Sequence, residues 1–542
     1  MKTPLIRQQL EIELIAAAKK LYPAAQIDWE ENCEVGYPPD YFDADYSSNA
    51  GLRLASAAQE RADAIAERLA ETLKTVPFYS ANAASIKTVN GFLNFKLKDD
   101  FLIDKINVMA HSRRTVHFGP ARSERKNILI EFISANPTGP LTLGNARGAF
   151  LGDVLSNVLA ASGSKVTREY YINNAKNSKQ IQELGKTCLG KSQSYLTPYL
   201  ARLIYELGRK KKIPQGEREA GYLLSSLVQK HNHAFITRKL KIKFDAWFKE
   251  EELYRQKAVQ KTFALLKENN LVYEKDGAQW MKTSDYGDEE DRVLIRSDGE
   301  ATYFLTDIAY HLDKYTRGYD ALIDIWGADH HGHVKRLHAA LRALGKPPQT
   351  LHVIITQIVR LIEGEEIAKM SKRAGMYVTL EELIDDVGVD AARFFFLMRS
   401  AHTHIDFDLE LAREKSEKNP VYYIQYAYVR AGNILAKAKK ERIPMPRRLP
   451  HGSVLVDERP LMVLLLRFDE IVFDIAKTHH VHQLTNYLTD TARAFHNFYE
   501  RARVLQESNK ELRGVRLALC AATHKILGAA FDLMGISRPK KM

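Results

Sequence analysis

The sequence predicts an α/β protein in which a doubly wound parallel sheet lies between a small N-terminal α+β domain and a C-terminal all-α helical bundle. Three observations predict this. Apolar strands alternate with helical segments from residue 126 onward, two amphipathic helical stretches and a half-buried strand come before them, and almost purely helical periodicity follows residue 389. We place the domains at 1–108, 109–400 and 401–542, with a helical insertion at about 190–243.

The length and the charge limit the class of protein. A chain of 542 residues can hold roughly three or four domains, each with its own core. The net charge of +12 favours a polyanionic partner. Three distant cysteines without a C-x-x-C pair argue for a reducing compartment, and we expect the cytoplasm. We find no signal peptide and no apolar run near the ~20 residues of a membrane span, so we expect no membrane partner.

The N-terminal domain is predicted from two kinds of periodicity. Apolar residues recur at helical spacing over 5–21 and again over 51–74, which predicts two amphipathic helices. In the segment NGFLNFKL, apolar Leu93, Phe95 and Leu97 alternate with Asn94 and Lys96, as in a half-buried strand. A basic segment at 111–126 follows, and a solvated linker is the better interpretation of it.

The periodicity of the sequence also predicts the structure of the middle and the end of the chain. Strands and helices alternate through KVTREYYIN, ATYFLTDIAYHLDKY, ALIDIWGADHHGH and LHVIITQIVRL, which indicates a Rossmann-like sheet with ligands at the carboxyl ends of its strands. The insertion is helical and basic, with the run Arg209–Lys212. In the C-terminal part, 481–507 has one apolar face, and four prolines within 439–460 predict a surface loop.

The stretch Ile130–Asp153, IEFISANPTGPLTLGNARGAFLGD, is the first candidate for a functional site. An apolar strand leads through a Pro/Gly turn into a helix whose first turns carry small residues. Free backbone N–H groups and the helix dipole would then face an anion, which suggests a nucleotide phosphate. An ordinary βα unit with a tight turn is the alternative.

Two further segments carry charged or metal-ligating residues. Lys369–Arg373, K-M-S-K-R, could form a cationic loop that closes on a polyphosphate, although lysine-rich loops are usually only solvated. The run Asp329–His333, D-H-H-G-H, contains three imidazoles and a carboxylate that could bind zinc or iron. Because adjacent side chains point in different directions, we do not expect a protein-bound metal there.

Taken together, these segments resemble a known family. The chain contains ANPTGPLTLGNARGAFLGD, KVTREYYINN, WGADHHGH, KMSKRAG, VDAARFFFLMRS and NPVYYIQYA in this order, and it resembles arginyl-tRNA synthetase, a class I aminoacyl-tRNA synthetase. The family's HIGH signature corresponds here to Thr142, Leu143, Gly144 and Asn145, so both histidines are replaced. Amide and hydroxyl donors could still bind phosphate oxygens there. The KMSK signature is intact at Lys369, Met370, Ser371 and Lys372.

The resemblance implies specific roles for individual residues. Glu131, Tyr303 and Asp307 match the pocket for the arginine side chain, and Ser134, Asn136 and Asp329 match positions that hold its amino and carboxylate ends. Carboxylates suit this task because a planar guanidinium pairs with them in a two-pronged fashion. The implied ATP-binding residues are Thr142, Leu143, Gly144, Asn145, Gly327, His330, His333, Lys369, Met370 and Lys372. The implied catalytic residues are Thr142, Gly144, Asn145, Lys369, Ser371 and Lys372.

An acid inside an apolar strand gives a separate argument for a cationic ligand. Burial of Glu131 without a cation would be costly, which suggests a bound positive group. An internal salt bridge from Glu131 to Arg147 or Arg168 is the alternative.

The reaction implied is the ATP- and Mg²⁺-dependent activation of arginine and its transfer to the terminal adenosine of tRNA(Arg). We expect a monomer with elbow contacts from the N-terminal domain and anticodon contacts from a DALR-type bundle. Tyr422, Tyr423, Tyr426, Tyr428 and Arg430 could contact bases, but tyrosines at this spacing more often belong to a core. Two other hypotheses stay open. One is a non-catalytic sensor or accessory subunit, motivated by the two lost histidines, and the other is a metal-dependent hydrolase built on Asp329 and its histidines.

Overall fold

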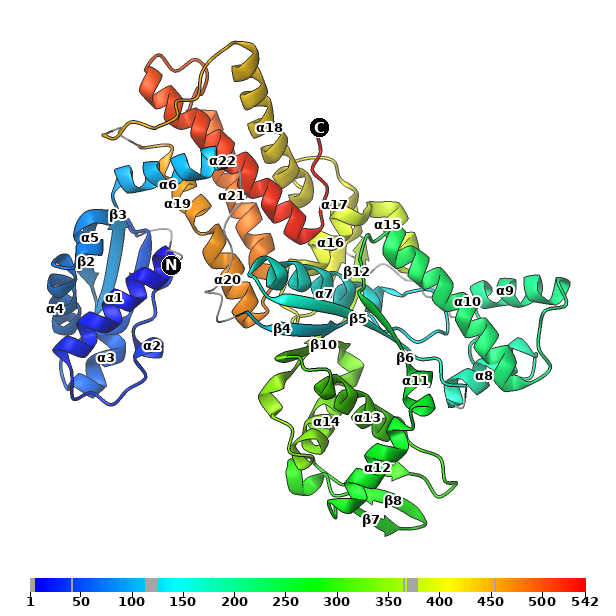
Figure 1. Ribbon diagram of the computed structural model, residues 1–542. Helices are drawn as coiled ribbons and strands as arrows, with labels where there is room; N and C mark the ends of the chain where they lie inside the picture. Colours follow the sequence, from blue (N-terminus) through cyan, green and yellow to red (C-terminus); the bar gives the residue numbers. More distant parts are fainter. Residues whose placement is uncertain are drawn as a thin grey trace.

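The computed structural model consists of an N-terminal unit, a central sheet with two insertions, and a helical bundle (Figure 1). It describes residues 5–39, 42–112, 125–176, 178–363, 366–367, 379–452 and 455–542. The chain starts in the N-terminal unit, passes along α6 to the bundle and the sheet, and returns to the bundle after β14.

The N-terminal unit packs helices on a three-stranded antiparallel sheet with strand order β1-β3-β2. Its elements are α1 (Ile6–Leu21), α2 (Trp29–Asn32), β1 (Tyr46–Ser48), α3 (Ala50–Ala58), α4 (Ala62–Lys74), α5 (Pro77–Asn82), β2 (Ala83–Val89), β3 (Phe92–Leu97) and α6 (Asp99–His111). The single helix predicted over 51–74 is wrong, because the chain forms α3 and α4 there. Gln59 ends α3 in the left-handed region with φ of 53°, and the apolar spacing continues across this turn.

The half-buried strand is confirmed as β3, with one difference. Leu93, Phe95 and Leu97 are buried as expected, but Asn94 on the opposite face is buried too. Its side-chain oxygen accepts a hydrogen bond of 3.0 Å from the hydroxyl of Ser47 on β1. The polar face of β3 is therefore covered where the neighbouring strand supplies a donor.

The central sheet has five parallel strands in the order β11-β10-β4-β5-β6. The strands are β4 (Asn127–Glu131), β5 (Lys165–Ile172), β6 (Ala246–Lys249), β10 (Ala321–Gly327) and β11 (Leu351–Thr356), and the flanking helices are α7 (Leu143–Ala161), α13 (Tyr303–Thr316) and α14 (His331–Ala343). Ile130 and Ile325 join the apolar cluster of α7, whereas Leu129 and Leu322 join that of α14. Both faces are therefore covered, and the predicted doubly wound sheet is confirmed.

The strand order fixes where a ligand can lie. The connection from β4 leads toward β5, whereas β10 lies on the other side of β4 and leads toward β11. The chain therefore leaves the carboxyl ends of β4 and β10 in opposite directions, which opens a crevice there. In register, Glu131 at the end of β4 pairs with Asp324 of β10 and with Glu169 of β5.

Two insertions leave the sheet (Figure 1). Between β5 and β6 lie α8 (Lys179–Cys188), α9 (Pro198–Arg209) and α10 (Glu217–Arg238), which share a small apolar cluster. Between β6 and α13 lie α11 (Glu250–Arg255), α12 (Ala258–Glu268), β7 (Val272–Lys275), β8 (Ala278–Met281) and β9 (Arg292–Ile295). After β11 the chain forms β12 (Val359–Glu363), β13 (Glu366–Ile367), α15 (Leu380–Val387), α16 (Val389–Leu397), β14 (Ile405–Asp408) and α17 (Leu409–Arg413).

The C-terminal bundle consists of α18 (Pro420–Lys440), α19 (Arg459–Leu466), α20 (Phe468–Thr478), α21 (His482–Arg501) and α22 (Lys510–Met534). The connection predicted within 439–460 runs from α18 to α19. By length and composition α22 could cross a membrane, but 83% of its most apolar window is buried inside the protein. Its partners include α18, α6 and α21, so α22 is the core helix of this bundle.

Candidate active site

A cavity of about 1120 Å³ lies at the carboxyl ends of β4 and β10, where the strand order predicts a ligand. Every predicted site residue that the structure describes lines it. These are Glu131, Ser134, Asn136, Thr142, Leu143, Gly144, Asn145, Tyr303, Asp307, Gly327, Asp329, His330 and His333. Lys369, Met370, Ser371 and Lys372 lie outside the described residues.

The amino end of α7 forms one wall of the cavity. Thr142 is the residue before the first turn, and Asn145 Oδ1 accepts hydrogen bonds from the Thr142 backbone N–H at 3.0 Å and from its hydroxyl at 3.2 Å. The Thr142 hydroxyl is therefore already donated within the helix cap. The amide nitrogen of Asn145 has no partner among the described residues, so it can donate to an anion at the helix terminus.

Glu131 is held in a buried polar network. Its Oε2 accepts from Lys314 Nζ at 2.5 Å and from the Tyr310 hydroxyl at 2.8 Å, and its Oε1 accepts from the Ser134 hydroxyl at 2.8 Å. Lys314 also donates to Asp324 Oδ1 at 2.7 Å. Burial raises the pKa of Glu131, and Lys314 opposes that shift. Although burial disfavours its charge, the pKa of Lys314 is raised by Asp324 and Glu131.

This network corrects two expectations about Glu131. Its salt-bridge partner is Lys314, not Arg147 or Arg168, and so the cation that its burial requires belongs to the protein. Arg147 instead donates to four backbone carbonyls, and Arg168 pairs with Asp153 and Asn157. Lys314 could not be predicted as the partner from the sequence pattern, because this lysine lies one helical turn beyond Tyr310 on α13, far from β4 along the chain.

Asp307 projects from α13 into the same cavity. Its Oδ2 lies 2.6 Å from His333 Nε2, which joins a residue predicted for the arginine side chain to one predicted for the nucleotide. Tyr303, one turn earlier on α13, is 55% exposed and also lines the cavity. One face of α13 thus presents a phenol and a carboxylate to the ligand space.

Glu250 is a cavity residue that the sequence analysis missed. It begins α11 directly after β6, is only 3% exposed, and accepts a 3.2 Å hydrogen bond from the Ala175 backbone N–H. Burial raises its pKa to about 7, and the nearby Asp307 carboxylate adds to the shift. No cation pairs with it among the described residues. Its place at a strand's carboxyl end was the signal, but Glu251 and Glu252 follow it, and the pattern does not tell which acid faces inward.

Comparison with known proteins agrees with this geometry. Three family models match the chain: the arginyl tRNA synthetase N terminal domain over residues 7–97, the catalytic domain of tRNA synthetases class I (R) over 214–400, and the DALR anticodon binding domain over 424–542. An arginine–tRNA ligase of Listeria monocytogenes is 38% identical over 99% of this chain and 100% of its own length. The chain belongs to the arginyl-tRNA synthetase family.

Other members of the arginyl-tRNA synthetase family match as completely. An arginine–tRNA ligase of Bacillus cereus is 37% identical over 99% of this chain and 98% of its own. The solved Thermus thermophilus arginyl-tRNA synthetase superposes with a TM-score of 0.80 at 23% identity, covering 99% of this chain and 100% of that one. At that identity, the likeness supports the shared fold.

The histidine run in this synthetase family member does not form a cluster of metal ligands. Asp329 and His330 are largely exposed and lie 3.5 Å apart, whereas His333 turns toward Asp307. Within the described ranges, no three His, Cys, Asp or Glu side chains are arranged to hold a metal ion. The hydrolase hypothesis therefore lacks its metal site in this part of the chain.

Proposed function

We propose that the protein is a catalytically active arginine–tRNA ligase, which activates L-arginine with ATP and transfers it to the terminal adenosine of tRNA(Arg). One observation carries the proposal. Besides the exposed Asp329, the cavity contains two carboxylates, Asp307 and Glu250, that have no Lys or Arg partner among the described residues. Glu131 is neutralised by Lys314, so these two acids remain for a cationic ligand.

The guanidinium of arginine is the cation that best suits this pair. It is planar, always charged and offers five donors in a fixed fork, and two carboxylates can accept from both of its edges. We assign Asp307 and Glu250 to this role, with Tyr303 alongside. Lysine has one compact ammonium group and citrulline has no charge, so both should bind poorly.

The loop after β4 would bind the amino and carboxylate ends of arginine. Ile133 and Ser134 both have positive φ, 69° and 38°, and this turn directs Ser134 and Asn136 to the cavity. The Ser134 hydroxyl is oriented between Glu131 and the Tyr171 backbone N–H. Asn136 Oδ1 accepts from Asn173 Nδ2 at 3.0 Å. We propose that Ser134, Asn136 and Asp329 orient the reacting end.

ATP would lie between the amino end of α7 and the end of β10. Gly144 and Asn145 present the helix terminus to its phosphates, and Gly327 and His330 lie on the opposite side of the crevice. We assign the leaving pyrophosphate to Lys369, Ser371 and Lys372. Mg²⁺ would arrive with the phosphates, since this ion commonly uses substrate phosphates and few protein ligands.

The chemistry follows from positioning and charge. One arginine carboxylate oxygen attacks the α-phosphorus in line, an O–P bond forms to give arginyl-adenylate, and pyrophosphate leaves with the electron pair of the broken P–O bond. A ribose hydroxyl of the tRNA's terminal adenosine then attacks the acyl carbon, the acyl C–O bond to the phosphate breaks, AMP leaves with that electron pair, and the hydroxyl proton passes to the AMP phosphate or to water. No covalent enzyme intermediate is needed, because the groups need only be aligned and neutralised.

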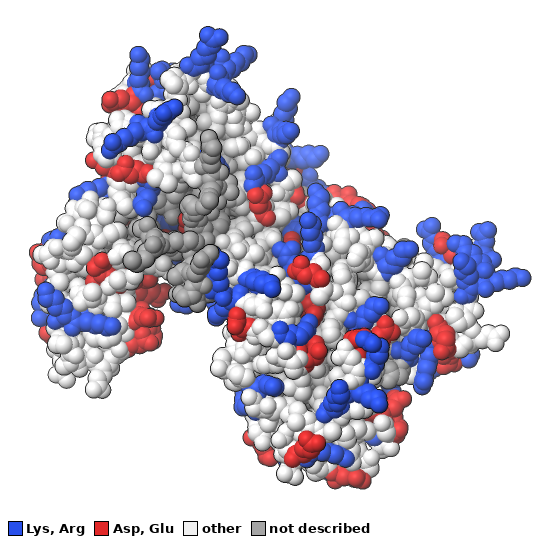
Figure 2. Space-filling view, in the orientation of Figure 1, with Lys and Arg blue, Asp and Glu red and all other residues white. Residues whose placement is uncertain are grey.

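The tRNA would bind along the basic surface. Figure 2 shows Lys and Arg side chains clustered over the end of the bundle near α18 and at the tip of α9. In the bundle, the Arg430 guanidinium lies between the rings of Tyr426 and Tyr499, 4.4 and 4.3 Å from their centres. Such a stack can extend to an unpaired base, so we place anticodon contacts there and elbow contacts on the N-terminal unit. We expect a monomer in the cytoplasm.

Pyrophosphate release tests the proposal. The purified protein is incubated with ATP, Mg²⁺ and unfractionated tRNA, and with arginine, lysine or citrulline. Release that requires arginine supports the ligase. If arginine binds but no pyrophosphate forms, the replacement of the two signature histidines has abolished activation and the proposed activity is wrong.

A further inference from the structure

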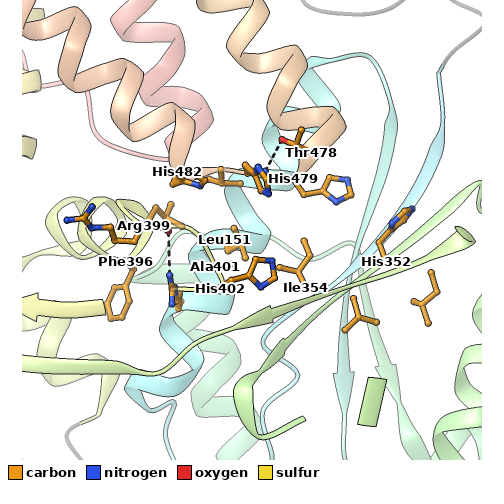
Figure 3. Close-up of a pocket in the computed structure, with 16 residues that line it drawn as sticks. Leu151, His352, Ile354, Phe396, Arg399, Ala401, His402, Thr478, His479 and His482 are labelled. Atoms are coloured by element: carbon orange, nitrogen blue, oxygen red, sulfur yellow. Dashed lines mark hydrogen bonds between the residues drawn. The ribbon is translucent and has the colours of Figure 1, made fainter. Parts of the chain in front are cut away.

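A second cavity, of about 290 Å³, lies between the sheet edge and the bundle (Figure 3). His352 and Ile354 on β11 form one side, the loop with Arg399 and His402 lies next to them, and the turn between α20 and α21 covers the cavity. That turn contributes His479 and His480, and His482 follows at the first residue of α21. We call this the histidine cavity.

The lining of the histidine cavity is unusual in its charge. It includes five histidines and two arginines, and no Asp or Glu. Arg147 is satisfied by the carbonyls of Gln357, Thr403, Arg399 and Ser400. The Arg399 guanidinium and the five imidazoles form no hydrogen bond or ion pair with any group that the structure describes. Imidazoles from three separate elements thus line one space that contains no carboxylate side chain.

The basic groups around the cavity oppose one another's protonation. The rings of His352 and His479 lie edge to face at 5.6 Å, and those of His480 and His482 are also 5.6 Å apart. Burial, and then His352, His480 and Lys126, lower the pKa of His479 to about 4. Burial and Lys126 lower the pKa of His352, and burial and His480 lower that of His482. His338 on α14 lies close enough to His352 to shift its own pKa.

A bound anion would stabilise the protonated imidazoles, which burial and the basic neighbours disfavour. It would accept from imidazole N–H groups, and its charge would favour the protonated rings. A tetrahedral phosphate group fits the donor set, because its oxygens can accept from several directions at once. A metal ion does not fit, since no three suitable ligands converge within the described ranges.

We propose that the histidine cavity binds a phosphate group through the imidazoles of His352, His402 and His479. The group would come either from free phosphate or pyrophosphate or from the backbone of bound tRNA. The site is separate from the ATP cavity, although Arg147 links the two. Its side chain holds the carbonyl of Gln357, which lines the ATP cavity, and those of the loop that carries Arg399.

Binding should be linked to histidine protonation. Each proton taken up with the anion makes the affinity fall by up to about tenfold per pH unit as pH rises above the free histidine pKa. The titratable and charged groups that line the cavity are His352 on β11, Arg147 on α7, Arg399 and His402 on the loop, His479 and His480 on the α20–α21 turn and His482 at the start of α21, with Lys126 nearby. No carboxylate lies among them to oppose this dependence.

Methyl NMR on the full chain tests the proposal, with inorganic phosphate as the probe at pH 6 and pH 8. The Ile354 methyl group lines the histidine cavity, and the Ile133 methyl group, on the loop after β4, lines the ATP cavity, so the two groups report on different sites. We expect Ile354 to shift on titration, with weaker binding at pH 8. A shift at Ile133 alone, or none at Ile354 at either pH, would overturn the proposal.

Substituted variants test which residues bind the phosphate, and added tRNA tests where the phosphate group comes from. His352→Gln and His402→Gln change exposed side chains and should each weaken the Ile354 response several-fold, while His451→Gln, far from the cavity and paired with Asp104, should not. Unchanged binding in both cavity variants would contradict the proposal. If saturating tRNA abolishes the phosphate response at Ile354, the natural ligand is an RNA phosphate. If the response persists, it is a free anion.

Discussion

The ammonium group of Lys314 lies 2.5 Å from Glu131 Oε2, and this contact divides the acids in and next to the cavity into two sets. Glu131 and Asp324 share the buried lysine, while Asp307 and Glu250 line the cavity and have no Lys or Arg partner among the described residues. Because an unpaired buried carboxylate is costly, Glu131 and Asp324 depend on Lys314, and a cationic ligand would stabilise the ionised forms of Asp307 and Glu250.

Substitution of Lys314 should lower the stability of the protein more than the loss of one surface charge would. Lys314→Met leaves Glu131 and Asp324 buried without their shared cation, and we expect about 3–5 kcal/mol less stability in denaturant unfolding. Lys335→Met is the control, because that lysine pairs with Glu289 on the surface and should change little. Equal effects of the two substitutions would mean that Lys314 does not neutralise the buried acids.

Asp307 and Glu250 should determine arginine affinity. Asp307→Asn and Glu250→Gln each lose one charge-assisted pair, worth about 1.5–3 kcal/mol, so the KM for arginine should rise roughly 10- to 150-fold. Asp307→Ala should abolish the use of arginine while tRNA binding stays nearly unchanged. Glu252→Gln is the control on the same helix, where Glu252 pairs with Arg255. A loss of tRNA binding equal to the loss of arginine binding would remove Asp307 from the pocket.

The raised pKa of Glu250 predicts how arginine binding depends on pH. Burial holds this pKa at about 7, and only the ionised carboxylate attracts a guanidinium. Arginine affinity, measured by calorimetry, should therefore fall as pH drops below about 7, by up to tenfold per pH unit. The free protein behaves oppositely, because a raised carboxyl pKa means that this group destabilises the fold as it ionises. Glu250→Gln should flatten the affinity profile, and an unchanged profile would exclude Glu250 as its cause.

Asn145 combines a structural and a functional role that one substitution can separate. Its oxygen caps α7, and its amide nitrogen, which has no partner among the described residues, can bind phosphate. Asn145→Asp keeps the capping oxygen but replaces the amide donor with a negative charge. We expect nearly unchanged thermal stability and a loss of ATP-dependent activity of at least about tenfold, from one lost donor and added repulsion. Full activity in this variant would show that Asn145 only caps the helix.

Much of the fold was predictable because it depends on local patterns. The period-2 and period-3.6 spacing located the parallel strands and the bundle, and the small residues before α7 indicated an anion site. The break at Gln59 was missed, since the apolar spacing of α3 and α4 continues across it. The buried Asn94 was missed because its partner, Ser47, comes from a distant strand.

The candidate site was predictable where its residues belong to recognisable motifs, and not where they meet only in space. The lining residues from the described motifs all reach one cavity. Lys314 and Glu250 carry no motif, and their importance arises from burial and from the register of β4, β5 and β10, which brings Glu131 beside Asp324 and Glu169. The pairing of His333 with Asp307 depends in the same way on α13 and α14 lying side by side.

The most direct test of the central claim is the charging of unfractionated tRNA with each of the twenty labelled amino acids, with and without ATP. The account predicts ATP-dependent incorporation of arginine alone, with Asn145 and Thr142 in place of the signature histidines. Incorporation of no amino acid by a protein that still binds tRNA, or of an amino acid other than arginine, would contradict it.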